Sequence, residues 1–114
     1  MRAFLFINVI SIILTHIFFI SFLIYKMDKY SDYAEVQRMA NKYGIGKVSL
    51  STRKDKKYMV ISPEGNKVHF GQIGYEDFTK HKDPERRRLF RLRNAKWSTM
   101  PKYSAGWLSY HLLW

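Results

Sequence analysis

The sequence predicts an α+β protein in which a single N-terminal transmembrane helix precedes a small basic domain. That domain is expected to contain a short antiparallel β-meander and two or three short helices. Three observations predict this class: residues 3–25 carry no charged side chain, residues 47–70 alternate polar and apolar side chains, and residues 83–85 (Asp-Pro-Glu) form a helix-start pattern. We divide the chain into a transmembrane anchor at 1–25, a stalk or amphipathic helix at 26–46 and a basic α+β domain at 47–114.

The charge is distributed unevenly along the 114 residues, which carry a formal net charge of +11. All 9 acidic residues and all but one of the 20 Lys and Arg follow the apolar stretch. The chain has no Cys, which excludes a disulfide framework, a thiolate zinc site and a cysteine nucleophile. A hydrophobic content of 46% is too high for a disordered chain. The composition therefore indicates an apolar anchor joined to a folded domain with anionic partners.

The apolar stretch at 3–25 is long enough to cross a bilayer. A helix rises about 1.5 Å per residue, so this stretch covers a hydrocarbon core of about 30 Å. A cleaved signal peptide is the alternative, but a signal core has only about 7–15 residues and no small-x-small cleavage pattern follows here. Lys26, Lys29 and the basic domain lie after the span, so the positive-inside rule places the C-terminal domain in the cytosol.

Three polar side chains interrupt the predicted span on one helical face, at Asn8, Ser11 and Thr15. Such side chains can form hydrogen bonds between packed membrane helices. The alternative is that Ser and Thr bond back to their own helix.

A short amphipathic helix is expected after the anchor, with Ser31 as N-cap and Gly44 as the residue that ends it, followed by the capping contact of Ile45. Its apolar stripe has helical spacing and comprises Tyr33, Val36, Ala40 and Tyr43. This helix either continues the anchor as a stalk or packs on the domain that follows.

The period then changes to two, which indicates β-structure. In residues 48–52, Val48, Leu50 and Thr52 alternate with serines, and residues 58–62 and 67–70 form two further predicted strands. Residues 63–66 (Pro-Glu-Gly-Asn) form a turn in which Gly65 can adopt positive φ. A three-stranded antiparallel meander is the simplest arrangement.

A second helix is expected from Asp83 as N-cap and Pro84 at its first position to about Ala95. Its predicted apolar face comprises Leu89, Phe90 and Leu92, and its remaining surface carries Arg86, Arg87, Arg88, Arg91 and Arg93. Five arginines with one nearby acid repel each other. A solvated face is one interpretation, but an anionic lipid, a nucleic acid or an acidic protein surface bound to this helix accounts for the charge better.

The last ten residues, 105–114, are too short to span a bilayer and predict a final short helix. Trp107 and Trp114 are its expected aromatic anchors, in the core or at an interface.

Candidates for chemistry cluster at His69, Asp77, His81 and Asp83. A divalent metal site or a nuclease could use such groups, but the spacing matches no known metal or catalytic motif. Asp83 is already explained as a helix cap. We therefore favour structural roles, and predict no enzyme, cofactor or small-molecule substrate.

Part of the chain resembles a known set of proteins. The run HFGQIGYEDFTKHKDPERRRLFRLRN at 69–94, followed by SAGWLSYHLLW at 104–114, is similar to small proteins of nucleocytoplasmic large DNA viruses, such as phycodnaviruses and mimiviruses. Within these runs the resemblance rests on His69-Phe70-Gly71, Gly74-Tyr75, Asp77-Phe78, His81, Asp83, Arg86-Arg87, Phe90, Arg93, Ala105-Gly106-Trp107 and Leu112-Leu113-Trp114.

The resemblance implies a virion or virus-factory protein. These viruses have a membrane beneath the capsid, and the capsid-facing side of that membrane was cytosolic during assembly. The expected function is a minor capsid component that tethers the inner virion membrane to the shell, with major and minor capsid proteins as partners. The alternative is a membrane-tethered nucleic-acid-binding protein or metal-dependent nuclease, in which Tyr75, Phe78 and Trp97 could stack bases.

Overall fold

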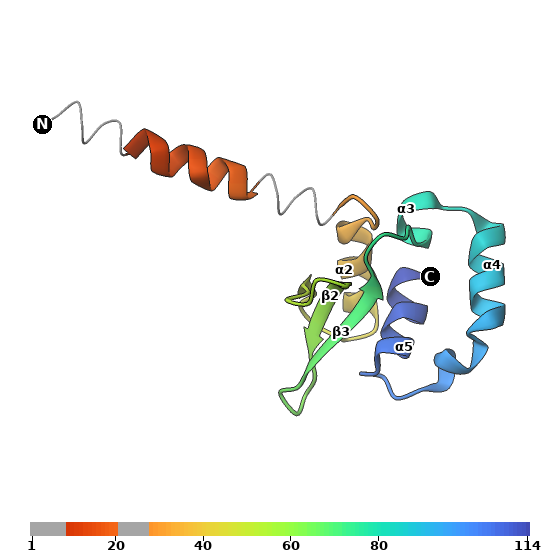
Figure 1. Ribbon diagram of the computed structural model, residues 1–114. Coiled ribbons are helices and arrows are strands. Elements are labelled where there is room, and N and C mark those ends of the chain that lie inside the picture. The colour runs from red at the N-terminus through yellow and green to blue at the C-terminus, as the bar shows by residue number, and fades with distance from the viewer. Residues whose placement is uncertain (1–8, 21–27) are drawn as a thin grey trace, which may run out of the picture.

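A computed structural model describes residues 9–20 and 28–114 (Figure 1). Residues 9–20 are helical. The elements of the domain follow in the order α2 (Tyr33–Lys42), β1 (Ser49–Leu50), β2 (Lys56–Ile61), β3 (Lys67–Gln72), α3 (Phe78–His81), α4 (Pro84–Arg93), a 3₁₀ turn η1 (Ala95–Thr99), α5 (Ala105–Leu108) and a π-helical turn η2 (Ser109–Leu113). The predicted α+β class is confirmed.

The sheet is the predicted antiparallel meander, in the order β1-β2-β3. Tyr58 of β2 pairs with Phe70 of β3, and Gly65 in the connecting turn has the expected positive φ of 88°. Strand β1 is shorter than predicted. The buried side chain of Ser51 hydrogen-bonds to His69 at 2.7 Å, and Thr52, which we expected to continue the strand, is exposed and lies outside it.

Helix α2 packs on the domain, which decides between the two alternatives left by the sequence. Val36 and Ala40 are fully buried in its core. Gly44 ends the helix at φ 68°, and the amide of Ile45 donates to the carbonyl of Ala40 at 2.9 Å, as expected of a glycine cap.

The N-cap of α2 differs from the prediction. Asp32 caps the helix by accepting from the amide of Glu35, whereas the hydroxyl of Ser31 donates to the carboxylate of Asp77. The physical reason is that Ser31 has a buried charged acceptor available from a distant part of the chain, which sequence spacing does not show.

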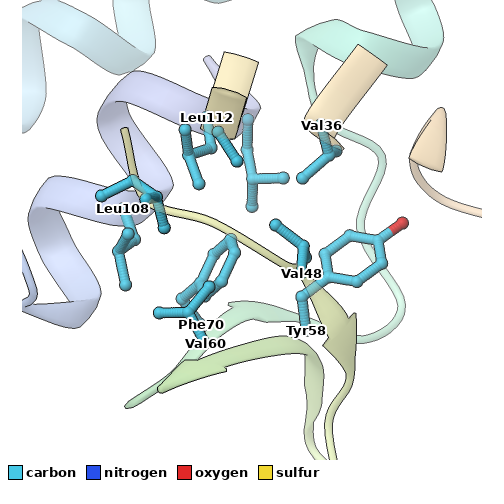
Figure 2. Close-up of a cluster of buried hydrophobic side chains, with 10 residues drawn as sticks. Val36, Val48, Tyr58, Val60, Phe70, Leu108 and Leu112 are labelled. Carbon is cyan, nitrogen blue, oxygen red and sulfur yellow. The ribbon is translucent and has the colours of Figure 1, made fainter. Parts of the chain in front are cut away.

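One hydrophobic core lies between the sheet, α2 and the C-terminal turns. Figure 2 shows Tyr58 and Phe70 from the sheet, Leu108 and Leu112 from α5 and η2, and Val36 of α2 gathered in this core. The rings of Tyr58 and Phe70 lie 6.0 Å apart. Gly71 lets η2 approach the sheet, because a Cβ at that position would lie 2.9 Å from Leu113 Cδ1.

Helix α4 lies at the periphery of the domain (Figure 1). Its start is as predicted: Asp83 accepts from the amides of Glu85 and Arg86, and Pro84 follows the cap. The predicted apolar face is wrong, since no residue of α4 is buried and Leu92 is 67% exposed. Phe90 alone of the three predicted apolar residues is stacked on the body of the domain, through Trp114. Most of the other side chains of the helix are exposed, whereas Arg87 and Arg91 are partly buried.

The helix at 9–20 consists mostly of large apolar side chains, and those are exposed, Phe18 by 80%. The hydroxyl of Thr15 donates to the carbonyl of Ser11 at 2.8 Å, so the donor of Thr15 is used within its own helix. Asn8 and the two ends of the predicted span at 3–25 lie outside the described residues. Within 9–20 and 28–114, no helix is long and apolar enough to cross a membrane.

Candidate functional site

The five arginines of α4 are divided between two clefts and the solvent. Arg88 points to solvent and pairs with Glu85, with 3.0 Å between its Nε and the carboxylate. Arg86 and Arg93, seven residues apart, line a cleft of about 420 Å³ on the side of α4 that faces the sheet. Arg87 and Arg91, four residues apart, line a second cleft of about 270 Å³ on the side that faces α2. We call these the sheet-side cleft and the α2-side cleft.

The sheet-side cleft has an aromatic wall. Phe90 and Trp114 stack in parallel, with ring centroids 4.2 Å apart and an interplanar angle of 6°, and Trp97 packs edge-on against Phe90 at 5.9 Å. Leu89, on the same side of α4, is 41% exposed. The wall is therefore apolar, and its three aromatic residues are only partly buried.

The rim of the sheet-side cleft is cationic. Arg86, Arg93 and Lys56 line it, and none of the three has an ion-pair partner among the described residues. Glu76 is the opposing carboxylate on the rim. An apolar wall with a surplus of cations around it suits a carboxylate-bearing partner that also presents an apolar side chain.

A buried ion pair closes the bottom of the sheet-side cleft. Lys57 Nζ lies 3.0 Å from Asp77 Oδ2, and the two side chains are 6% and 1% exposed. The other carboxylate oxygen of Asp77 accepts from the amide of Thr79 at 3.0 Å and from the Thr79 hydroxyl. Because Ser31 also donates to Asp77, this pair joins the sheet, α3 and the segment before α2.

The surroundings of this pair shift two pKa values. Burial lowers the pKa of Lys57, against the opposing attraction of Asp77. Burial raises the pKa of Tyr58, whose hydroxyl shares a hydrogen bond with Ser31. All these buried polar groups have partners, as a structural network requires.

The α2-side cleft is the more cationic of the two. The guanidinium of Arg87 lies 4.5 Å from the centre of the Phe78 ring, and that of Arg91 lies 5.3 Å from the centre of the Tyr110 ring. Arg91 also donates to the main-chain oxygen of Trp114 at 2.9 Å. Burial, followed by repulsion from Arg87, lowers the pKa of Arg91.

The four residues proposed as metal candidates are not brought together. His69 binds Ser51, Asp77 binds Lys57, and the ring of His81 accepts from the amide of Asp83 at 2.9 Å, while Asp83 itself caps α4. The described residues contain no group of three or more His, Asp or Glu placed to hold a metal ion.

The aromatic anchors take two different positions. Trp107 is half-buried and packs edge-on against Tyr43, the C-cap residue of α2, at 5.3 Å. Trp114 lies between the clefts, in contact with Phe90 and with the ring of His81 at 5.1 Å. Two of the proposed base-stacking residues already contact other side chains of the domain: Phe78 packs against Arg87, and Trp97 packs against Phe90. The third, Tyr75, is 66% exposed.

Sequence reasoning missed Lys57 and both clefts. One local pattern does indicate that Asp77 has a structural role. In Asp77-Phe78-Thr79, the aspartate caps a short helix by accepting from the amide two residues later. No local pattern indicates that Lys57 is buried, because its partner lies 20 residues further along the chain.

The fold and the clefts together define a small basic α+β domain with a peripheral arginine helix. Residues 46–94, from the start of the meander to the end of α4, match a family model described as "Family of unknown function (DUF5754)". No curated protein and no solved structure matches the chain.

Proposed function

We propose that this chain is a membrane-anchored structural protein that ties a bilayer to a protein shell. The observation that carries the proposal is the helix at 9–20, whose apolar side chains are exposed along its whole length, Phe18 by 80% and Ile12 by 58%. Burial of such side chains in lipid is favourable by about 25 cal/mol per Å² of apolar surface. The anchor is the apolar stretch 3–25, which crosses the bilayer once.

The other end of the tether is the face of α4 at the sheet-side cleft. Arg86, Leu89 and Arg93 follow one another on this face at helical spacing and line the cleft together. Exposed leucine between unpaired arginines suits an acidic protein surface with an apolar side chain better than it suits a phosphate backbone, which offers no apolar contact.

The setting of the proposal comes from the resemblance to proteins of large DNA viruses. In that setting the chain is a minor capsid protein and its partners are the major and minor capsid proteins. It sits in the inner membrane of the virion, with the domain on the side that faces the capsid. This function is structural and uses no enzyme activity, cofactor or small-molecule substrate.

Cross-linking in purified virions tests the proposal. Lys56 lines the sheet-side cleft, so an amine-reactive reagent should join it to capsid proteins. Lys82, in the α2-side cleft, is the control position on the same domain. Cross-links of Lys56 to DNA-binding proteins of the core alone, with none to shell proteins, would contradict the tether.

A second candidate function is a membrane-tethered nucleic-acid binder, including a metal-dependent nuclease. The net charge of the chain and the exposed ring of Tyr75 favour it. A nucleic-acid binder should show a DNA affinity that falls steeply with salt concentration, because each phosphate contact releases a counterion. Weak DNA binding at physiological salt favours the tether.

A further inference from the structure

The α2-side cleft gathers cations from three elements. Arg38 and Lys42 come from α2, Lys82 from the end of α3, and Arg87 and Arg91 from α4. Residues that are far apart in the sequence therefore place five positive charges around a hollow of about 270 Å³.

These charges are not balanced by the protein. Glu35 is the carboxylate that lines the cleft, and Arg38 already holds it, with 2.9 Å between its Nε and the carboxylate. For Lys42, Lys82 and Arg87, the part of the chain at 9–20 and 28–114 supplies no ion-pair partner. Like charges in a partly desolvated cleft repel each other, so an anion bound there stabilises the arrangement.

Two buried donors in the cleft lack an acceptor. Neither Arg87 Nε nor Arg91 Nε has a hydrogen-bond partner, although both atoms are shielded from solvent. A buried N–H without an acceptor is costly, more so when it is charged. The two guanidinium groups therefore depend on their outer N–H groups for hydrogen bonds, and a phosphate, with several oxygens, suits converging arginines and lysines.

The backbone of Lys82 adopts a left-handed conformation. Lys82 is the one described non-glycine residue with positive φ, at 56°. A left-handed backbone is unfavourable for a lysine relative to ordinary conformations. The residue nevertheless holds its side chain at the cleft, where it adds to the positive charge.

The cleft adjoins the segment that follows the apolar anchor. Thr79 lines the cleft, and its hydroxyl accepts from the amide of Asp32 at 2.9 Å. A chain of n residues spans at most about 3.6 Å × n, so the few residues between the span and Asp32 keep this wall close to the membrane surface. Among possible sources of phosphate, the nearest is the bilayer itself.

We propose that the α2-side cleft binds the phosphate of an anionic lipid headgroup in the same bilayer that holds the anchor. This inference rests on the proposed membrane anchoring, and it deepens that proposal. Arg87 and Arg91 hold the headgroup, Lys42 and Lys82 contribute charge, and the domain is thereby oriented with the opposite face of α4 toward the partner. The two arginine pairs of α4 thus have separate ligands.

The test uses the full chain in phosphatidylcholine nanodiscs with and without phosphatidic acid. Thermal unfolding is followed by tryptophan fluorescence, since Trp114 lines the cleft. Phosphatidic acid should raise the melting temperature by roughly 5 °C, as expected of a ligand that binds the folded state alone. The Arg87→Gln/Arg91→Gln variant should lose this rise. The matched control, Arg86→Gln/Arg93→Gln, removes the same charge from the other cleft and should keep it.

A second variant covers the case in which the arginine variant folds poorly. Lys82→Gly removes a cation and relieves the positive φ, so it should unfold at the same or a higher temperature than the wild type. Its response to phosphatidic acid should nevertheless shrink. A stable Lys82→Gly protein with an undiminished response would contradict the proposal.

The remaining outcomes separate the sources of the anion. Incorporation into neutral discs without any response to phosphatidic acid leaves the anchor intact and overturns the lipid site. Failure to enter neutral discs overturns the anchor itself. Inorganic phosphate or a DNA duplex that reproduces the whole rise in neutral discs, with none from phosphatidic acid, overturns the lipid source. Equal loss in both arginine double variants reduces the effect to general surface charge and also overturns the site.

Discussion

Lys57 Nζ lies 3.0 Å from Asp77 Oδ2, and this buried pair holds the segment before α2 to the end of the sheet. The ammonium group also approaches the carbonyl of Tyr30 at 3.5 Å, and the amide of Asp77 donates to the same carbonyl at 3.3 Å. The segment before α2 is therefore fixed to the domain. In the proposed tether, force on the anchor would pass to the sheet through this fixed point.

Loss of the buried carboxylate should strongly destabilise the domain. In Asp77→Ala the ammonium of Lys57 stays buried without its partner, so the free energy of unfolding should fall by about 3–5 kcal/mol. Asp83→Ala, which removes an exposed helix cap, should cost only about 1 kcal/mol. Urea unfolding of the full chain in neutral nanodiscs measures both. Equal, small losses in the two variants would show that the pair contributes little.

Substitutions at Gly71 and Gly65 should distinguish the cost of backbone strain from the cost of close packing. Both have positive φ, at 77° and 88°, but a Cβ would lie 2.9 Å from Leu113 at Gly71 and has open space at Gly65. Gly65→Ala should therefore lower the free energy of unfolding by about 1–2 kcal/mol through strain alone. Gly71→Ala should cost about 1–3 kcal/mol more, because Leu113 must move. Thermal melts of the two variants measure this difference. Identical melting temperatures would contradict the close approach of Leu113 to Gly71.

The sequence predicted those parts of the fold that local chemistry determines. The meander, the glycine cap at Gly44 and the Asp83-Pro84 helix start were all predicted, because each depends on neighbours within about one turn of chain. The N-cap of α2 was placed one residue too early. Ser31 is drawn to Asp77, 46 residues away, and no local pattern reports that contact.

The candidate site was predicted in composition but not in arrangement. The division of the arginines into an 86/93 pair and an 87/91 pair follows from helical periodicity alone. What those pairs face depends on where α4 lies relative to α2 and the sheet. We predicted that Leu89 and Leu92 form a core face, because apolar residues at helical spacing are usually buried. In the structure the helix packs on the domain through Phe90, and both leucines are exposed.

Acid should weaken the domain through His81. Burial, followed by repulsion from Arg86, lowers the pKa of His81 below its usual 6.5. Below pH 6.5 the unfolded chain then takes up a proton that the folded domain does not, so stability is complete above this pH and declines as the pH falls toward the lowered value. We expect a loss of up to about 1 kcal/mol between pH 7.5 and 5.5 from this residue. His81→Gln should remove that part of the decline in urea titrations at the two pH values; an unchanged decline would assign it to other groups.

The proposed anchor predicts the orientation of the chain in the membrane. Lys26, Lys29 and the basic domain follow the apolar stretch, so residues 26–114 should face the cytosol. Protease added to sealed microsomes should digest that part of the chain. Protection of the whole domain until the membrane is opened with detergent would reverse the orientation, and with it the placement toward the capsid.

Reversal of one arginine pair at a time separates a protein tether from a genome binder. Arg86 and Arg93 lie with Leu89 at the sheet-side cleft, so Arg86→Glu/Arg93→Glu should weaken retention of capsid proteins on the membrane on the order of 100-fold. Arg87→Glu/Arg91→Glu changes the charge equally on the opposite side of the helix, leaves the proposed contact surface in place and should lower retention much less. Retention is measured as capsid protein that sediments with the membrane of disrupted virions. In a genome binder, by contrast, all the arginines contact phosphates interchangeably, and both reversals lower DNA affinity alike. Tight DNA binding by the wild type at about 150 mM salt, lost equally in both variants, would reject the tether.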